Sequence, residues 1–223
     1  MKNTVIFFTL GFTLLLSTVC FAQKTISEGT VRYEISLQSR SKENKPDNAF
    51  AGATSTTYLK GGLSRTEMKT ALGTETVIYN SKLGNAAILK EYSGQKLMIL
   101  LTKENWDARS KKFEGIVFET ANETKVIEGY NCKRAIAQLK DGTSISVYYT
   151  PDLVAINKDY DRAFLNLPGF PLEYEIETAK LLFSYKLSSI DFNTVPSSKF
   201  EYPQTGYRVM TYEENIKGQG GQQ

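Results

Sequence analysis

Apolar and polar residues alternate along most of this chain, which is the pattern of β-strands that bury one face. Val31, Tyr33 and Ile35 are each followed by a charged or polar residue, so one side of this strand faces a core and the other faces water. Similar short runs recur between turn residues. The predicted strands cover residues 31–38, 56–59, 64–69, 76–80, 86–92, 96–102, 116–120, 133–139, 144–150, 173–177, 181–192 and 207–212.

The regular spacing of these runs predicts an antiparallel meander. Asp141-Gly142 connects two of them and is the strongest hairpin signal in the chain. A sheet of this size must curl, close or fold over. We therefore predict a mainly β fold, a strongly curved antiparallel sheet or half-barrel, formed by one domain over residues 23–217.

Two interruptions of the alternation predict short helices that cover one face of the sheet. Residues 103–113 carry Trp106 and Phe113, with charges between them and no glycine or proline. Residues 159–167 place apolar side chains at helical spacing, with Asp159 as the N-cap and Pro168 as the stop. Neither segment is long enough to be stable alone, so both must pack on the sheet.

The segment after the second predicted helix combines a turn with a strand. Pro168-Gly169 predicts a type II turn, because proline fixes φ and glycine accepts a positive φ. Leu172, Tyr174 and Ile176 then alternate with glutamates at 173, 175 and 177. Paired carboxylates can serve acid–base chemistry, but this alternation favours the solvent side of a half-buried strand.

Two further stretches lack periodicity. Residues 40–53 are charged at first and small at their end, which favours a loose loop, with a mobile flap as the alternative. Residues 218–223, after the predicted domain, contain only glycine and glutamine. This composition predicts a disordered tail.

The first 22 residues have the features of a signal peptide. Lys2 is followed by an apolar run over residues 5–16 and by Ala22, the small residue that precedes a cleavage site. The apolar run is too short to span a bilayer, and no later run approaches that length. We expect an exported protein, periplasmic or extracellular, without a transmembrane segment. A lipid anchor on Cys20 is the less favoured alternative.

Composition excludes several partners and reactions. The net charge of +3 is spread along the chain, which gives no electrostatic basis for nucleic-acid binding. Removal of the signal peptide leaves Cys132 as the one cysteine, so no intramolecular disulfide can form. Cys132 is either a small buried hydrophobe or a free reactive thiol.

The chain contains no histidine, which removes Ser-His and Cys-His nucleophile pairs and the commonest zinc ligand. Asn157, Asp159 and Asp161 resemble the start of a calcium loop, but Arg162 and Pro168 occupy positions that require glycine and glutamate. No phosphate-binding or dinucleotide motif is present. We therefore expect no catalytic residues, no metal and no cofactor.

Aromatic residues are the main remaining resource, with 13 tyrosines in the chain. Core packing accounts for most of them. The alternative is an apolar cavity inside the curved sheet, rimmed by tyrosine hydroxyls. The residues expected to line such a cavity are Val31, Tyr33, Ile35, Val147, Tyr149 and Tyr174.

Four segments carry a family resemblance, namely LPGFPLEY at 167–174, KVIEGYNCK at 125–133, VYYTP at 147–151 and FEYP with GY over 200–207. In this order they resemble the GLPGLI family and its less strict relatives, which are exported bacterial proteins mostly without assigned activity. The resemblance implies an architecture similar to the curved half-barrels of periplasmic lipoprotein carriers. It implies no catalytic residues.

These observations support three hypotheses of different classes. The leading one is a non-enzymatic envelope protein whose curved sheet holds an apolar ligand, a lipid or an acyl chain. The alternative is a structural or interaction module with a filled core that binds other envelope proteins through strand edges or the loop at 40–53. The third is an enzyme that uses carboxylates and tyrosines alone, which the missing motifs disfavour.

Overall fold

A computed structural model describes residues 23–40 and 50–220. The expected signal peptide, Cys20 and most of the expected loop at 40–53 lie outside these residues. The strands are β1 (Lys24–Ile26), β2 (Glu28–Ser39), β3 (Ala53–Lys60), β4 (Leu63–Thr70), β5 (Gly73–Asn80), β6 (Asn85–Tyr92), β7 (Gln95–Leu101), β8 (Glu119–Ile127), β9 (Tyr130–Gln138), β10 (Ser144–Thr150), β11 (Leu153–Ala155), β12 (Phe170–Glu177), β13 (Leu181–Asp191) and β14 (Arg208–Thr211). The helices are α1 (Lys103–Ser110) and α2 (Tyr212–Gly220), with 3-10 turns η2 (Lys111–Phe113), η3 (Arg162–Phe164) and η4 (Ser197–Phe200).

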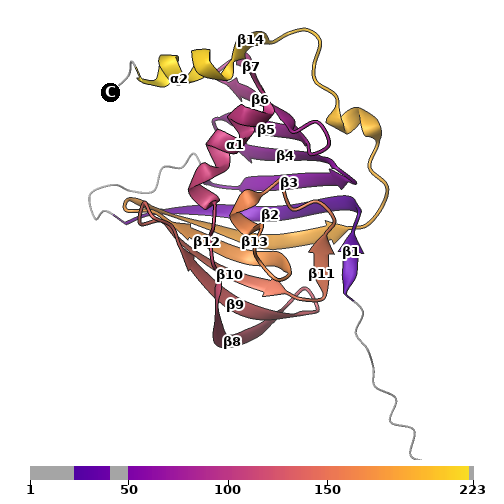
Figure 1. The fold of residues 1–223 in the computed structure, drawn as a ribbon, viewed down its shortest axis with the longest axis vertical. Coiled ribbons are helices and arrows are strands. Elements are labelled where there is room, and N and C mark those ends of the chain that lie inside the picture. The colour runs from indigo at the N-terminus through magenta and orange to yellow at the C-terminus, as the bar shows by residue number, and fades with distance from the viewer. Residues whose placement is uncertain (1–22, 41–49, 221–223) are drawn as a thin grey trace, which may run out of the picture.

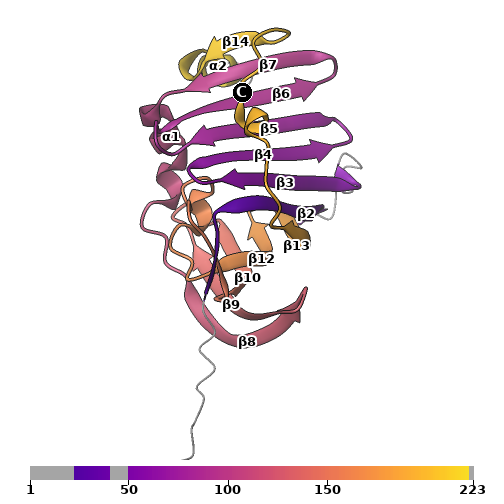
Figure 2. The ribbon, with the colours of Figure 1, turned by 90° about the vertical axis from the view of Figure 1, so that its right-hand side faces the viewer.

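Within the described residues, one 12-stranded sheet runs in the order β14-β7-β6-β5-β4-β3-β2-β13-β12-β10-β9-β8. All neighbours in it are antiparallel except β14 and β7, and β1 with β11 forms a separate parallel pair. The upper half, from β14 to β3, is a ladder of strands, whereas the lower half curls strongly toward β8 (Figures 1 and 2). The sheet stays open, with β14 and β8 as its edges. The predicted fold class, mainly β with a strongly curved antiparallel sheet, is confirmed.

The main core fills the concave side of the curled half. Alternate residues of β2, β9, β10, β12 and β13 point inward and bury their side chains, as Val31, Val147 and Leu172 do. The segment that follows β11 enters this space and contributes Phe164 and Leu167 to the same cluster. The strand periodicity of the sequence therefore selects the face that is buried.

Each face of the upper half is covered by a different segment. On the concave side, Trp106 of α1 stacks on Tyr79 of β5, with 4.6 Å between ring centroids. A capping box between Thr102 and Asn105 starts this helix. On the convex side, residues 192–207 run across the sheet, where Phe200 packs with Ile78 and its neighbours (Figure 2). The upper half is thus a three-layer structure.

Several predicted elements differ from the structure. The helix predicted at 159–167 is reduced to η3, and Asp159 caps no helix, because burying Ala163, Phe164 and Leu167 in the curl takes precedence over helical hydrogen bonding. The strand predicted at 116–120 begins only at Glu119 and continues to Ile127.

The chain's C-terminal part also differs. The strand predicted at 207–212 is β14, which gives way to α2 at Tyr212. This helix reaches Gly220, so it includes the first residues of the predicted disordered tail, and residues 221–223 lie outside the described part. Acidic residues Glu213 and Glu214 in its first turn favour the helix. The three-residue strands β1 and β11 were too short for a periodicity to predict.

Gly169 is required for a different reason from the one the sequence suggested. The predicted type II turn is wrong, because Gly169 does not adopt a positive φ. Instead the chain passes very close to the end of β10, where a Cβ atom on Gly169 would lie 2.2 Å from the carbonyl oxygen of Thr150 and 2.7 Å from the Tyr149 ring. Glycine here permits the close approach of two backbones.

We predict that Gly169→Ala lowers the free energy of unfolding by about 2 kcal/mol or more, because backbone atoms must move to admit one methyl group. Urea unfolding of the mature protein measures this change. Gly52→Asn is the control, since Gly52 has a φ of 70° that asparagine tolerates and nothing lies within 4 Å of its Cβ position. Equal effects of the two substitutions would contradict the close-approach explanation.

Candidate functional site

A groove of about 250 Å³ opens on the concave face, where the upper half of the sheet meets the curled half. Strands β3 to β5 form its floor, β12 and β13 form one wall, and η2 and η3 provide the covering side. The residues that line it are Ser55, Thr66, Met68, Glu75, Val77, Phe113, Asp161, Ala163, Phe164, Tyr174, Ile176 and Tyr185. We refer to it as the concave groove.

Aromatic rings give the concave groove a preformed wall. Tyr174 stacks on Tyr185 with 4.4 Å between centroids, and Phe164 meets Tyr174 edge-on at 4.8 Å. Behind them, Tyr33 packs edge-on against Tyr174 at 5.6 Å, and its hydroxyl donates a 2.8 Å hydrogen bond to the carbonyl of Pro171. Such contacts fix the rings in place. The wall is therefore apolar and rigid.

One carboxyl group faces this apolar wall. Asp161 is half-buried, and desolvation raises its pKa to about 6. Burial also raises the pKa of Tyr185 to about 12, with the negative charge of Asp161 as a second cause. On the floor of the groove, Oε2 of Glu75 lies 3.8 Å from Nζ of Lys90. A group with a strongly shifted pKa in a concave site is a common feature of binding sites.

The six residues expected to line a cavity are all buried. Val31, Tyr33, Ile35, Val147 and Tyr149 are between 0% and 6% exposed and pack in the interior, whereas Tyr174 also lines the concave groove. Alternation identified the inner face but not where that face meets open space. The sequence analysis placed Phe113 in a predicted helix and Asp161 in a segment that resembles a calcium loop, but it assigned neither to a cavity. Both lie in segments without strand alternation, so the pattern that identified the inner face could not identify them as groove residues.

The three glutamates of β12 take no part in the groove. Glu173 forms a 2.8 Å ion pair with Lys125, Glu177 pairs with Arg40, and Glu175 accepts a 3.0 Å hydrogen bond from Ser184. They lie on the face of the strand opposite to Tyr174. The interpretation of these residues as the polar side of the strand is consistent with this arrangement.

No group of three or more cysteine, aspartate or glutamate side chains gathers closely enough to hold a metal ion among residues 23–40 and 50–220. In the segment that resembles a calcium loop, Nε of Arg162 lies 3.7 Å from Oδ1 of Asp159, and Nη1 of Arg162 lies 2.7 Å from Oδ1 of Asp107 in α1. The guanidinium group of Arg162 therefore pairs with both carboxylates. In the described part of the chain, no helix has both the length and the apolar character needed to cross a membrane.

Cys132 is buried, with 1% of its surface exposed. Its Sγ donates to the carbonyl of Tyr130 at 3.4 Å, and desolvation raises the pKa of the thiol to about 11. A thiol with so little thiolate at neutral pH is a poor nucleophile. The structure thus agrees with the buried-hydrophobe interpretation.

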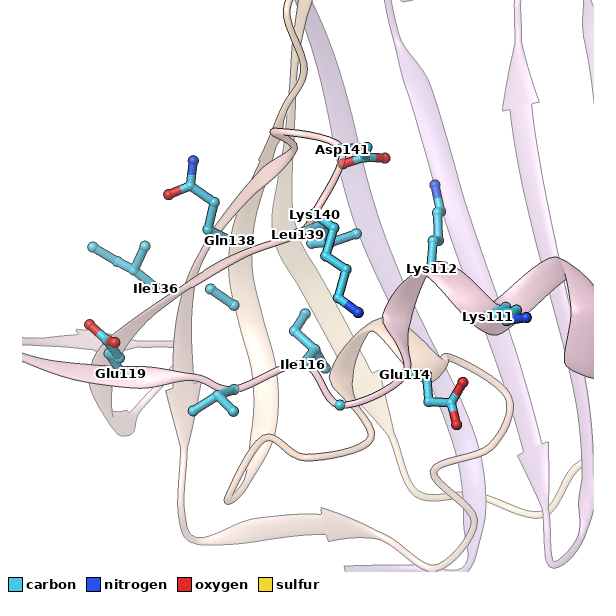
Figure 3. A pocket seen from close by; sticks show the side chains of 13 residues that line it. Lys111, Lys112, Glu114, Ile116, Glu119, Ile136, Gln138, Leu139, Lys140 and Asp141 are labelled. Atoms are coloured by element: carbon cyan, nitrogen blue, oxygen red, sulfur yellow. The ribbon is translucent and has the colours of Figure 1, made fainter.

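A second, wider groove of about 810 Å³ lies between the η2–β8 connection and the end of β9 (Figure 3). We call it the outer groove. Ile116, Ala137 and Leu139 form its buried apolar part, and Val117 and Ile136 are exposed at its side. The connecting segment 111–117 borders both grooves, because Phe113 lines the concave groove and its neighbours line the outer one.

No protein-family model and no curated protein matches this chain. Among solved structures, PNGF-II aligns with 86% of this chain at 14% identity and a TM-score of 0.47, and the chain spans about a third of it (32%). An uncharacterized conserved protein from Thermus thermophilus aligns over 83% of this chain and 91% of its own, with a TM-score of 0.49 and 10% identity. The Mycobacterium tuberculosis lipoprotein LppX aligns over 73% of this chain and 86% of its own, with a TM-score of 0.40 and 6% identity. These likenesses are too weak to carry a conclusion about function.

We predict that Asp161→Asn stabilises the protein at pH 7.5 by about 1–2 kcal/mol, with a gain that nearly vanishes at pH 4. The folded-state pKa of Asp161 is raised to about 6, so the folded state holds its proton more tightly and loses stability as the pH rises through that value. Thermal unfolding at both pH values measures the difference.

The control for this prediction is Asp141→Asn. The Thr143 amide lowers the pKa of the Asp141 carboxyl, so this substitution should destabilise the protein at pH 7.5 rather than stabilise it. A destabilising Asp161→Asn at pH 7.5 would show that the carboxylate is needed in its charged form.

We also predict that Cys132 in the mature protein reacts with a disulfide reagent at pH 8 about 100-fold more slowly than in denaturant, because its raised pKa and burial leave little accessible thiolate. Reaction with 5,5′-dithiobis-(2-nitrobenzoate), followed by absorbance, measures both rates. A similar rate in both conditions would identify Cys132 as an accessible thiol.

Proposed function

We propose that this protein is an exported, non-catalytic envelope protein whose concave groove binds the apolar part of a small amphipathic ligand, such as the end of an acyl chain. The observation that carries the proposal is the rigid wall of Phe164, Tyr174 and Tyr185 facing half-buried Met68 and Val77 across open space. Partly exposed apolar side chains in a concave site gain free energy when a ligand removes them from water.

The size of the groove limits what it can take. Its 250 Å³ is below the roughly 300–1,000 Å³ of pockets that enclose drug-sized ligands. The space inside the curl is filled by Leu167, Phe170 and their neighbours. The ligand therefore inserts one end, and its polar part stays at the mouth, within reach of groups such as Ser55, Thr66 and Asp161.

Two features support a binding role over catalysis. The sequence has no histidine, and Glu75, the other carboxylate of the groove, faces Lys90 rather than Asp161 as a partner. General acid–base catalysis needs positioned groups within hydrogen-bond reach of one reacting centre.

The signal-peptide features of residues 1–22 support export, and mass measurement of the mature protein distinguishes cleavage after Ala22 from acylation at Cys20.

A second candidate function is protein interaction through the free edge of β8. This strand ends the sheet order, and Val126 on it is 67% exposed. Open strand edges accept extended peptides by backbone hydrogen bonding. Hydrogen exchange of β8 amides, measured with and without envelope extract, tests this function, and unchanged exchange would reject it.

We predict that the neutral fluorophore N-phenyl-1-naphthylamine binds the mature protein and that Met68→Trp weakens this binding at least tenfold, because the indole fills the groove. Fluorescence titration measures the dissociation constant. Leu72→Trp is the matched control, since it places the same side chain in the next turn, where Leu72 is 60% exposed. Native mass spectrometry of gently purified protein should also show a bound amphiphile.

Unchanged binding by the Met68→Trp variant would place the fluorophore outside the concave groove. The proposal would be rejected if native mass spectrometry shows only the ligand-free mass and the unsubstituted protein does not bind the fluorophore. Protein interaction through β8 would then be the remaining candidate function.

A further inference from the structure

The outer groove combines an apolar floor with a cation that has no ionic partner. Ile116, Ala137 and Leu139 are between 4% and 6% exposed, and Ile136, whose side chain lies on the other side of β9 from Ala137, is 39% exposed. Lys140 turns across the groove so that its ammonium group points toward Ile116 (Figure 3). Among the described residues, no carboxylate lies within ion-pair distance of Lys140.

The other charged groups of this groove lie at its rim. The side chains of Glu114 and Glu119 point away from the space above Ile116, as does that of Lys111 (Figure 3). Asp141 accepts a 2.9 Å hydrogen bond from the Thr143 amide, and the positive charge of Lys112 helps to lower its pKa. Lys140 is therefore the one charge of the lining that faces inward.

From this arrangement we infer that the outer groove binds a single-chain amphiphile with an anionic head group, such as a long-chain carboxylate. The chain lies against Ile116, Ala137 and Leu139 and extends past the edge of β9 to Ile136 on the other side of the strand, and the head group accepts hydrogen bonds from Lys140. The aliphatic stem of a lysine covers apolar surface, and its ammonium group binds an anion. Lys140 can therefore contact both parts of such a ligand.

The charge distribution favours a single ligand over a membrane surface. A membrane contact needs a net positive face against anionic lipids, whereas Lys111, Lys112 and Lys140 are balanced here by Glu114, Glu119 and Asp141 in the same lining. The balanced lining offers no net attraction to an extended anionic surface. It leaves one inward cation for one anionic group.

This inference concerns a different site from the concave groove, and its test is independent of the proposed function. Dodecanoate is titrated into the mature protein below its micelle-forming concentration, and the methyl NMR signals of Ile116 and Ile136 are followed. We expect both signals to shift on binding. Lys140→Gln should weaken dodecanoate binding about fivefold and leave the weaker binding of dodecanol unchanged.

Matched variants separate the two parts of the site. Lys133 lies on β9 outside the groove, so Lys133→Gln should leave binding unchanged. Ile136→Asp should abolish binding of both ligands, and its exposed position keeps the fold intact. Met68→Trp should block the fluorophore in the concave groove and leave the dodecanoate shifts at Ile116 and Ile136 in place.

Three results would overturn the inference. If dodecanol and dodecanoate bind with equal affinity and Lys140→Gln has no effect, the groove does not recognise an anionic head group. If acetate produces the same shifts with the same affinity, the acyl chain does not contribute to binding. Binding to phosphatidylglycerol vesicles without any binding of soluble dodecanoate would identify a membrane contact instead.

Discussion

The structure depends on the burial of segment 153–170 inside the curl of one open sheet. A strongly curved sheet that does not close exposes its inner face to water unless something fills it. Here Phe164, Leu167 and Phe170 fill it and are at most 5% exposed. Because this segment has little regular structure, its carbonyl groups and those near it need other partners. Lys158 provides one, with its Nζ 2.7 Å from the Leu167 carbonyl.

The two grooves are consequences of this packing. The filling segment covers the curled half and touches the upper half at Asn157 and Tyr160, and α1 covers the upper half around Trp106 and Tyr79. The space between the two covered regions is the concave groove, and segment 111–117 separates it from the outer groove. Asp161 faces this space because the chain turns there from β11 back to β12. The same geometry that fills the core therefore leaves a half-buried carboxyl group beside an aromatic wall.

Most of the fold could be predicted from the sequence, whereas little of the candidate sites could. Strand alternation placed Val31, Tyr33, Val147 and Tyr174 on the inner face, and all four are buried. The Asp141-Gly142 hairpin is also present, with a 2.8 Å bond from the Leu139 amide to the Thr143 carbonyl. The groove residues of the covering segments follow no local period, so local patterns could not predict them.

Most strands, the buried face of those with clear alternation and the lack of histidine chemistry follow from the sequence, because they depend on composition and on residues two positions apart. Tertiary contacts set how far the sheet curls, which segment fills it and where apolar side chains remain half-exposed. They also explain why Gly169 is needed, since the atom that a side chain would meet, the Thr150 carbonyl oxygen, belongs to another strand. Contacts between residues distant in sequence set all of these features, and no local pattern records them.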